Sequence, residues 1–190
     1  MRVMVVDQSE ARRKEVAAAL TDCGYDVVAR LASYETLKAQ VAHFQPDVIL
    51  IDMDSPDRDS LEALREVHRD HPKPIVMFSD ADDSSLIQDA VNAGVTAYVV
   101  DGLQAHRLKP IIEVAIARFR NFQSLRDELA ETKSKLAERR EIEKAKGLLM
   151  QRKGLTEEQA HQALRKLAMN QNAKLGDVAR QLLTIATLLD

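Results

Sequence analysis

Short apolar runs alternate with helix-patterned segments through the first half of this 190-residue chain. We predict strands over 3–6, 25–31, 48–51, 74–78 and 97–100, with helices over 9–24, 33–44, 60–69 and 84–93. Runs of Val and Ile without polar alternation are typical of strands that are buried on both faces. Strands that alternate with helices form a parallel sheet with helices on both sides. The sequence therefore predicts an α/β fold with a five-stranded, doubly wound parallel sheet.

Polar residues end four of these strands. Asp7 and Gln8 follow the first strand, Asp52 the third, Ser79 the fourth and Asp101 the fifth. Sites in such sheets form beyond the carboxyl ends of the strands, so we expect these five residues to line one pocket. Carboxylates are ligands for Mg²⁺, and one of them can attack a phosphoryl group. The alternative is that the aspartates only cap the helices that follow them.

A long helical pattern runs from residue 103 to about 153. Its apolar residues over 121–138 repeat at spacings of three and four, which is the seam of a two-heptad coiled coil. The seam residues are Phe122, Leu125, Leu129, Thr132 and Leu136. Because an apolar stripe on a polar helix needs a partner to cover it, we predict a parallel coiled-coil homodimer. The alternative is a solvated linker helix.

The charge of the chain is divided unevenly along its length. Residues 1–120 carry 14 Lys and Arg against 20 Asp and Glu, whereas residues 139–190 carry 10 against 6 and have no aromatic residue. The basic segment reads as a small helical module, with Gly154 ending the long helix and Thr156 opening the next helix with a capping box. Without aromatics, it would bind nucleic acid through Lys and Arg on helix faces. The alternative is that these cations are solvated helix faces.

The sequence also argues against several classes of protein. The longest apolar runs are far shorter than the roughly 20 residues of a membrane span. The lone cysteine, Cys23, cannot form an internal disulfide, so nothing indicates an oxidising compartment. The five histidines are scattered and make no nucleophile–base pair. We expect a soluble, cytoplasmic protein that is not an enzyme and has no membrane partner.

Residues 1–120 resemble the receiver domain of response regulators, which has a flavodoxin-like fold. The resemblance rests on the stretches Val-Met-Val-Val-Asp7, Pro-Asp-Val-Ile-Leu-Ile-Asp52, Pro-Ile-Val-Met-Phe-Ser79 and Ala-Tyr-Val-Val100. It implies that Asp52 is the phospho-acceptor and that Asp7 and Asp52 would hold Mg²⁺. Receivers usually have a second acid where Gln8 stands and a lysine where Asp101 stands. An anion in place of that lysine repels a phosphoryl group, so we expect that phosphorylation of Asp52 is not the normal signal and that no cofactor is required.

Residues 139–190 resemble the ANTAR domain, the RNA-binding module of the AmiR and NasT family of antiterminators. The matching blocks are Ala-Lys146-Gly147-x-Leu-Met, Thr156-x-Glu-x-Ala, Ala-Leu-Arg165-x-x-Ala and Lys174-Leu-x-Asp-Val-Ala. The resemblance implies RNA contacts by Lys146, Arg165 and Lys174, and further contacts by Arg139, Arg140 and Arg180. Gly147 would let an RNA backbone, or equally another helix, approach closely.

The whole chain is similar to NasT-type regulators of nitrate and nitrite assimilation. The resemblance implies a transcription antiterminator that binds paired hairpins in nascent leader RNA. It also implies that a nitrate- or nitrite-sensing protein sequesters the regulator through its degenerate receiver. The alternative is a response regulator that is switched by phosphorylation and binds DNA.

Overall fold

The computed structural model describes residues 1–100 and 104–188. The chain divides into two compact units, Met1–Gln123 and Ser124–Asp190.

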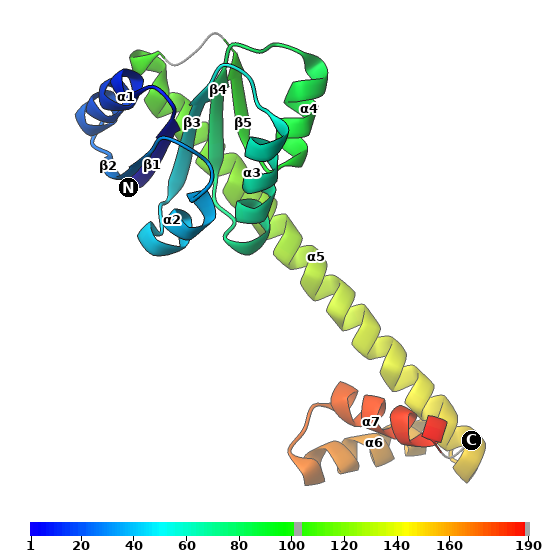
Figure 1. Cartoon of the computed structure of the whole chain (residues 1–190). Helices are drawn as coiled ribbons and strands as arrows, with labels where there is room; N and C mark the ends of the chain where they lie inside the picture. Colours follow the sequence, from blue (N-terminus) through cyan, green and yellow to red (C-terminus); the bar gives the residue numbers. More distant parts are fainter. Residues whose placement is uncertain (101–103, 189–190) are drawn as a thin grey trace. The chain divides into compact units, whose positions relative to one another are not determined.

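The first unit is built around one parallel sheet (Figure 1). Its strands lie in the order β2-β1-β3-β4-β5, so β1 has a neighbour on each side and the strand order reverses there. The strands are β1 (Arg2–Asp7), β2 (Asp26–Leu31), β3 (Val48–Met53), β4 (Ile75–Ser79) and β5 (Ala97–Val100). The helices between them are α1 (Glu10–Asp22), α2 (Leu37–Phe44), α3 (Arg58–Asp70) and α4 (Ser84–Asn92), and α5 (Ala105–Lys153) follows β5.

The two faces of the sheet carry separate hydrophobic clusters, because successive residues of a strand point to opposite sides. Met4 and Val6 of β1 face α2, α3 and α4, whereas Val3 and Val5 face α1 and the start of α5 (Figure 1). Alternate residues of β3 and β4 divide in the same way. The predicted doubly wound fold is thus confirmed. Helices cover both faces of the sheet, as is expected for strands that are apolar on both sides.

Two helix starts differ from the sequence prediction. The helix expected over 33–44 begins only at Leu37. The helix expected from Ser60 begins at Arg58, because the Asp57 carboxylate accepts from the Ser60 backbone N–H at 2.8 Å and closes a capping box. Both differences lie at the first turn of a helix, where the polar residues of the loop make the start of the apolar pattern hard to recognise.

In α5, the residues of the predicted seam are exposed. The side chains of Phe122, Leu125, Leu129 and Leu136 are all more than half exposed, from 51% to 64%. Upstream of them, Leu108, Ile112 and Ala115 of the same helix are buried against the sheet. The seam is therefore a largely exposed apolar stripe along α5.

The second unit joins the end of α5 to α6 (Glu157–Gln171) and α7 (Leu175–Leu188). The predicted capping box at Thr156 is present, with Gln159 as its partner. The core of this unit is small and consists of Ala145, Leu164, Ala168, Val178 and Ala179.

We found no membrane-spanning candidate among the helices of the described residues, because none of them is both long and apolar enough.

Candidate functional site

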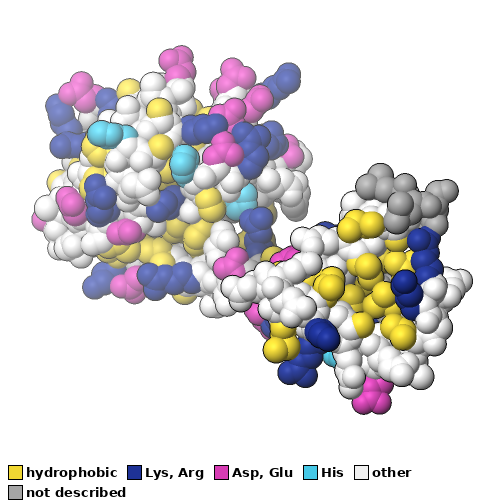
Figure 2. Space-filling view, turned by 90° about the horizontal axis from the view of Figure 1, so that it is seen from below, with side chains coloured by type: hydrophobic (Ala, Val, Ile, Leu, Met, Phe, Trp, Pro, Cys, Tyr) yellow, Lys and Arg dark blue, Asp and Glu magenta, His cyan; other side chains and the backbone are white. Residues whose placement is uncertain are grey.

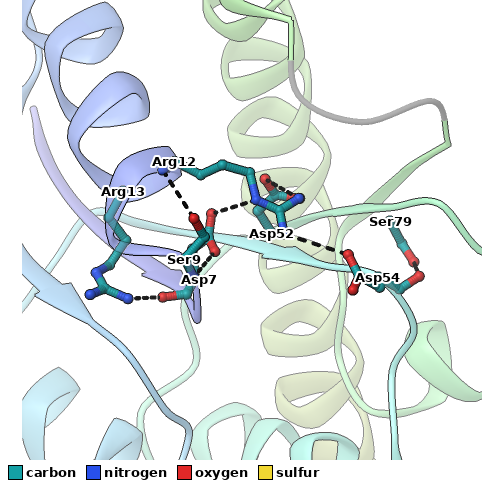
Figure 3. A network of polar contacts seen from close by, with 7 residues as sticks. All are labelled: Asp7, Ser9, Arg12, Arg13, Asp52, Asp54 and Ser79. Carbon is teal, nitrogen blue, oxygen red and sulfur yellow. Dashed lines mark hydrogen bonds and ion pairs between the residues drawn. The ribbon is translucent and has the colours of Figure 1, made fainter.

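The fold brings the two predicted metal-binding aspartates together. Asp7 is the last residue of β1 and Asp52 the last but one of β3, and the two are register partners in these adjacent parallel strands. They are 1% and 6% exposed, and Ser79, at the end of the next strand, is 1% exposed. Figure 3 shows the three residues at this edge of the sheet. The strand order reverses at β1, which is the usual position of a site in this kind of sheet.

The two carboxylate oxygens of Asp7 have different surroundings. Oδ1 accepts a hydrogen bond from the Ser9 backbone N–H at 2.7 Å, at the start of α1. Oδ2 is buried and has no hydrogen-bond partner among the described residues. The N-cap residue of α1 is Ser9 and not Asp7, so Asp7 holds the backbone of the capping residue through Oδ1 and its Oδ2 stays available to a cation.

The guanidinium of Arg12 lies among three carboxylates at the mouth of the pocket (Figure 3). Its Nε is 3.7 Å from Asp7 Oδ2, its Nη1 is 3.8 Å from Asp52 Oδ2 and its Nη2 is 3.5 Å from Asp54 Oδ1. The α1 helix places Arg12 here because its first turn begins directly after β1; the Ser9 hydroxyl accepts from the Arg12 backbone N–H at 3.4 Å. Arg12 is the cation of this pocket within the described residues.

Asp52 is difficult to ionise in this position. Burial raises the pKa of its carboxyl to about 6, Arg12 lowers it, and the nearby carboxylates of Asp7, Asp80 and Asp54 raise it further. The net upward shift means that the single guanidinium does not offset desolvation and the crowding of like charges. A further cation would therefore be favourable beside Asp52.

The other residues predicted for this pocket differ in their positions. Gln8 is exposed and lines a small cavity of about 140 Å³ together with Asp7, Asp52 and Arg12. The Ser79 hydroxyl donates to the Asp54 carbonyl at 3.0 Å and accepts from the Ala81 backbone N–H at 3.2 Å. Asp101 lies outside the residues that the structure describes.

The residues present fit a hydrated Mg²⁺ ion. Mg²⁺ commonly binds through one or two carboxylates and keeps several of its waters, and Asp7 and Asp52 supply such a pair with one unpartnered oxygen. Among the described residues there is no cluster of three or more acidic, histidine or cysteine side chains arranged around a metal position. The pocket thus offers a two-carboxylate site, and not a closed protein cage.

In the second unit, two of the predicted RNA contacts lie in one groove. Arg165 of α6 and Lys174, just before α7, line it together with His161, Met169 and Asn172. Arg165 and Lys174 are exposed, and neither forms an ion pair with a described residue. Figure 2 shows hydrophobic side chains gathered on one face of this unit with Lys and Arg beside them. The exposed apolar residues of the unit include Met150, Leu167, Met169 and Ile185.

Two other predicted cations are held by carboxylates. Lys146 is only 7% exposed, and its Nζ lies 2.7 Å from Glu157 Oε1 and 2.9 Å from Glu143 Oε1. Both contacts raise the pKa of Lys146. The Arg180 guanidinium lies 3.0 Å from Glu141 Oε2. Lys146 therefore links α5 to α6 within the unit. Its RNA contact stays a prediction, and its burial and two ion pairs argue against that contact.

The remaining predicted contacts lie on the surface of α5. Arg139 and Arg140 are exposed and have no ion pair with a described residue. Gly147 is exposed too, and apart from its own helix no described atom lies within 4 Å of the point where a Cβ would stand. Packing of Gly147 against another helix is thus not observed among the described residues, and its role in RNA approach stays a prediction.

Sequence reasoning missed Arg12 and Asp54 as parts of the strand-end pocket. The Arg12 side chain is 44% exposed, but its guanidinium leans over the pocket. Arg12 could have been found from its place in the first turn of α1. This helix begins directly after β1, so a long side chain in its first turn can reach back to the end of the strand.

Comparisons with known proteins match both units. The response regulator receiver domain model matches residues 3–113, and the ANTAR domain model matches residues 130–183. The transcriptional regulatory protein PdtaR of Mycobacterium tuberculosis is 30% identical over 190 residues, which cover 100% of this chain and 93% of PdtaR.

Two further matches each cover part of the chain. The nitrate regulatory protein of Klebsiella oxytoca is 44% identical over 80 residues, which are 42% of this chain but 20% of that protein. A CheY-like receiver domain from Methanospirillum hungatei superposes with a TM-score of 0.56 at 21% identity, over 63% of this chain and 96% of that one. The last comparison bears on fold alone.

Proposed function

Because this chain belongs to the response regulators that join a receiver domain to an ANTAR domain, we propose that it acts as a transcription antiterminator that binds RNA. The target is a pair of hairpins in nascent leader RNA, and binding prevents a downstream terminator from forming. The relative PdtaR is a transcriptional regulatory protein, which supports the proposal of a regulator and not of an enzyme. The cytoplasm, where transcripts are made, is the proposed location.

The observation that carries this proposal is the cationic groove of the second unit. Arg165 and Lys174 are exposed there, so their charges are available to phosphates and to the edges of unpaired bases. Arg139 and Arg140 extend the positive surface along α5. The unit has no Phe, Tyr or Trp for base stacking, so recognition rests mainly on charge and hydrogen bonding.

A homodimer suits a target with two hairpins. The exposed seam at Phe122, Leu125, Leu129 and Leu136 would be covered by the same seam of a second copy. Each copy then presents one groove, and the second hairpin binds at a raised effective concentration once the first is held.

The receiver unit is proposed as a docking surface for a sensor protein that sequesters the regulator. Gln8 stands where receivers usually have a second acid, and Arg12 already supplies a positive charge to Asp7 and Asp52. Both features make aspartyl phosphorylation a poor switch. The likeness to a nitrate regulatory protein supports nitrate or nitrite as the signal that the partner senses.

Receiver domains typically bind Mg²⁺ in this pocket. Here Asp7 and Asp52 would hold the ion, which when bound would offset the negative charge of the two buried carboxylates.

A gel-shift competition tests the proposal. The full-length protein should bind a leader with two hairpins, lose that binding when the loop bases are scrambled, and be competed poorly by duplex DNA. Arg165→Ala and Lys174→Ala should each weaken binding and reduce its salt dependence by about one ion. Lys166→Ala is the matched control, since Lys166 is an exposed cation of α6 outside the groove.

The same assay distinguishes control by a partner protein from control by phosphorylation of Asp52. Asp52→Asn should leave release by the partner unchanged if the receiver is a docking surface. Loss of regulation by that single change, or preferential binding of duplex DNA, would favour the phosphorylation-switched DNA-binding regulator instead.

A further inference from the structure

We propose that Arg12 is a built-in counter-cation of the receiver pocket that competes with Mg²⁺ for Asp7 and Asp52. This inference concerns the first unit alone and stands whether or not the ANTAR domain binds RNA.

The buried carboxylates need a positive charge. Asp7 and Asp52 lie at the ends of neighbouring strands with less than a tenth of their surface exposed. Two like charges in such a place repel each other and lose hydration. Arg12 is the cation that contacts both of them within the described residues, and its Nε and Nη1 each face one carboxylate.

The contacts of Arg12 are ion pairs without hydrogen bonds to the two buried carboxylates. At 3.7 and 3.8 Å, the nitrogens lie beyond hydrogen-bond distance, and Asp7 Oδ2 is left without a hydrogen-bond partner. The guanidinium therefore offsets charge without occupying the oxygen that a metal ion would use. Moving the guanidinium away would cost only Coulomb attraction, because no hydrogen bond to Asp7 or Asp52 would be broken.

Asp54 gives the displaced guanidinium a second position. This carboxylate is 83% exposed at the rim of the pocket and lies 3.5 Å from Arg12 Nη2. Arg12 is itself 44% exposed, so its head group can move outward toward Asp54 while α1 stays in place. Repulsion by a Mg²⁺ ion bound to Asp7 and Asp52 would drive this outward movement, and the same repulsion between the two cations lowers the affinity for the ion.

Calorimetric titration of MgCl₂ into the EDTA-treated full chain tests the competition. Arg12→Met and Arg12→Gln should each bind Mg²⁺ at least tenfold more tightly than the original chain, because the competing charge is gone. Arg12→Lys should return the affinity toward the original value. Lys14→Met is the matched control: it removes the same charge from the same helix, but Lys14 pairs with exposed Glu10 outside the pocket. Its Mg²⁺ affinity should change less than twofold.

Two results would overturn the proposal. One is that both neutral variants bind Mg²⁺ no more tightly than the original chain. The other is that Lys14→Met gains as much affinity as Arg12→Met, since the effect would then come from net charge and not from the position of Arg12.

A measurement on the unaltered chain guards against variants that fail to fold. The Arg12 Nε–Hε resonance, assigned by its loss in Arg12→Lys, should shift as Mg²⁺ saturates the pocket. A resonance that stays unchanged at saturation would show that Arg12 does not move for the ion, and would also refute the competition.

Discussion

Replacing Asp52 by asparagine should stabilise the first unit at neutral pH. The buried carboxyl of Asp52 has a pKa of about 6 in the folded chain against an ordinary value of 3.8. A carboxyl whose pKa is raised by folding stabilises the fold below pH 4, where it is protonated in both states. That contribution is lost as pH rises through 6, because the folded state must then hold a desolvated charge.

The expected size follows from the shift. A difference of about two pKa units, at 1.36 kcal/mol per unit, corresponds to roughly 3 kcal/mol. The isosteric Asp52→Asn variant carries no such charge, so its free energy of unfolding should exceed that of the original chain by about this amount at pH 7. The difference should shrink toward zero near pH 4.

Urea unfolding followed by tyrosine fluorescence measures this difference. All three tyrosines, Tyr25, Tyr34 and Tyr98, lie in the unit Met1–Gln123, so the signal reports that unit alone. EDTA keeps metal ions out of the comparison. Asp82→Asn, in the exposed loop between β4 and α4, is the control and should show no comparable gain. A variant that is less stable at pH 7, or a gain that does not depend on pH, would refute the reasoning.

Three further predictions follow from the structure. Leu129→Asp places a charge in the seam, where the leucine is 54% exposed in the single chain, and should weaken dimerisation at least 100-fold by light scattering. Ala130→Asp, also exposed, should leave the dimer intact. Gly147→Ala should stabilise the second unit by up to about 1 kcal/mol in thermal unfolding, because no neighbour opposes a methyl group there; weaker hairpin binding by the same variant would indicate that RNA passes close to this point. Gly94→Ala should destabilise the first unit by about 2 kcal/mol, because φ is +101° and a Cβ would lie 2.5 Å from His68 Cγ; an unchanged urea midpoint would contradict this.

The sheet could be predicted because its strands are marked by composition alone. Runs such as residues 48–51 are apolar on both faces, and strands of this kind occur when helices cover a parallel sheet on both sides. The register that pairs Asp7 with Asp52 follows from the same pattern, since both residues end such runs. The first residues of helices were harder to predict. The loop before Leu37 has no capping side chain that would mark the start of α2.

The carboxylates of the strand-end pocket could be predicted from the sequence, whereas the surroundings of the cations could be predicted only in part. Some ion pairs join residues that are distant in sequence: the pattern around Lys146 gives no sign that Glu157 binds it, and Arg180 meets Glu141, which is 39 residues away. Arg165 and Lys174 are exposed as expected. Arg12 was not predicted because a charged residue on the polar side of a helix gives no sign in the sequence of the carboxylates that its side chain reaches.

The core of the second unit has a consequence for which sequences can replace this one. Three of its five residues are alanines, and Ala145 and Ala179 are fully buried. Helices that meet through methyl groups lie close together, so a larger side chain at these points forces the backbones apart. Hydrophobic character is therefore not a sufficient criterion there: valine or leucine would be disruptive although both are apolar, and the volume of the side chain becomes a property that constrains substitution.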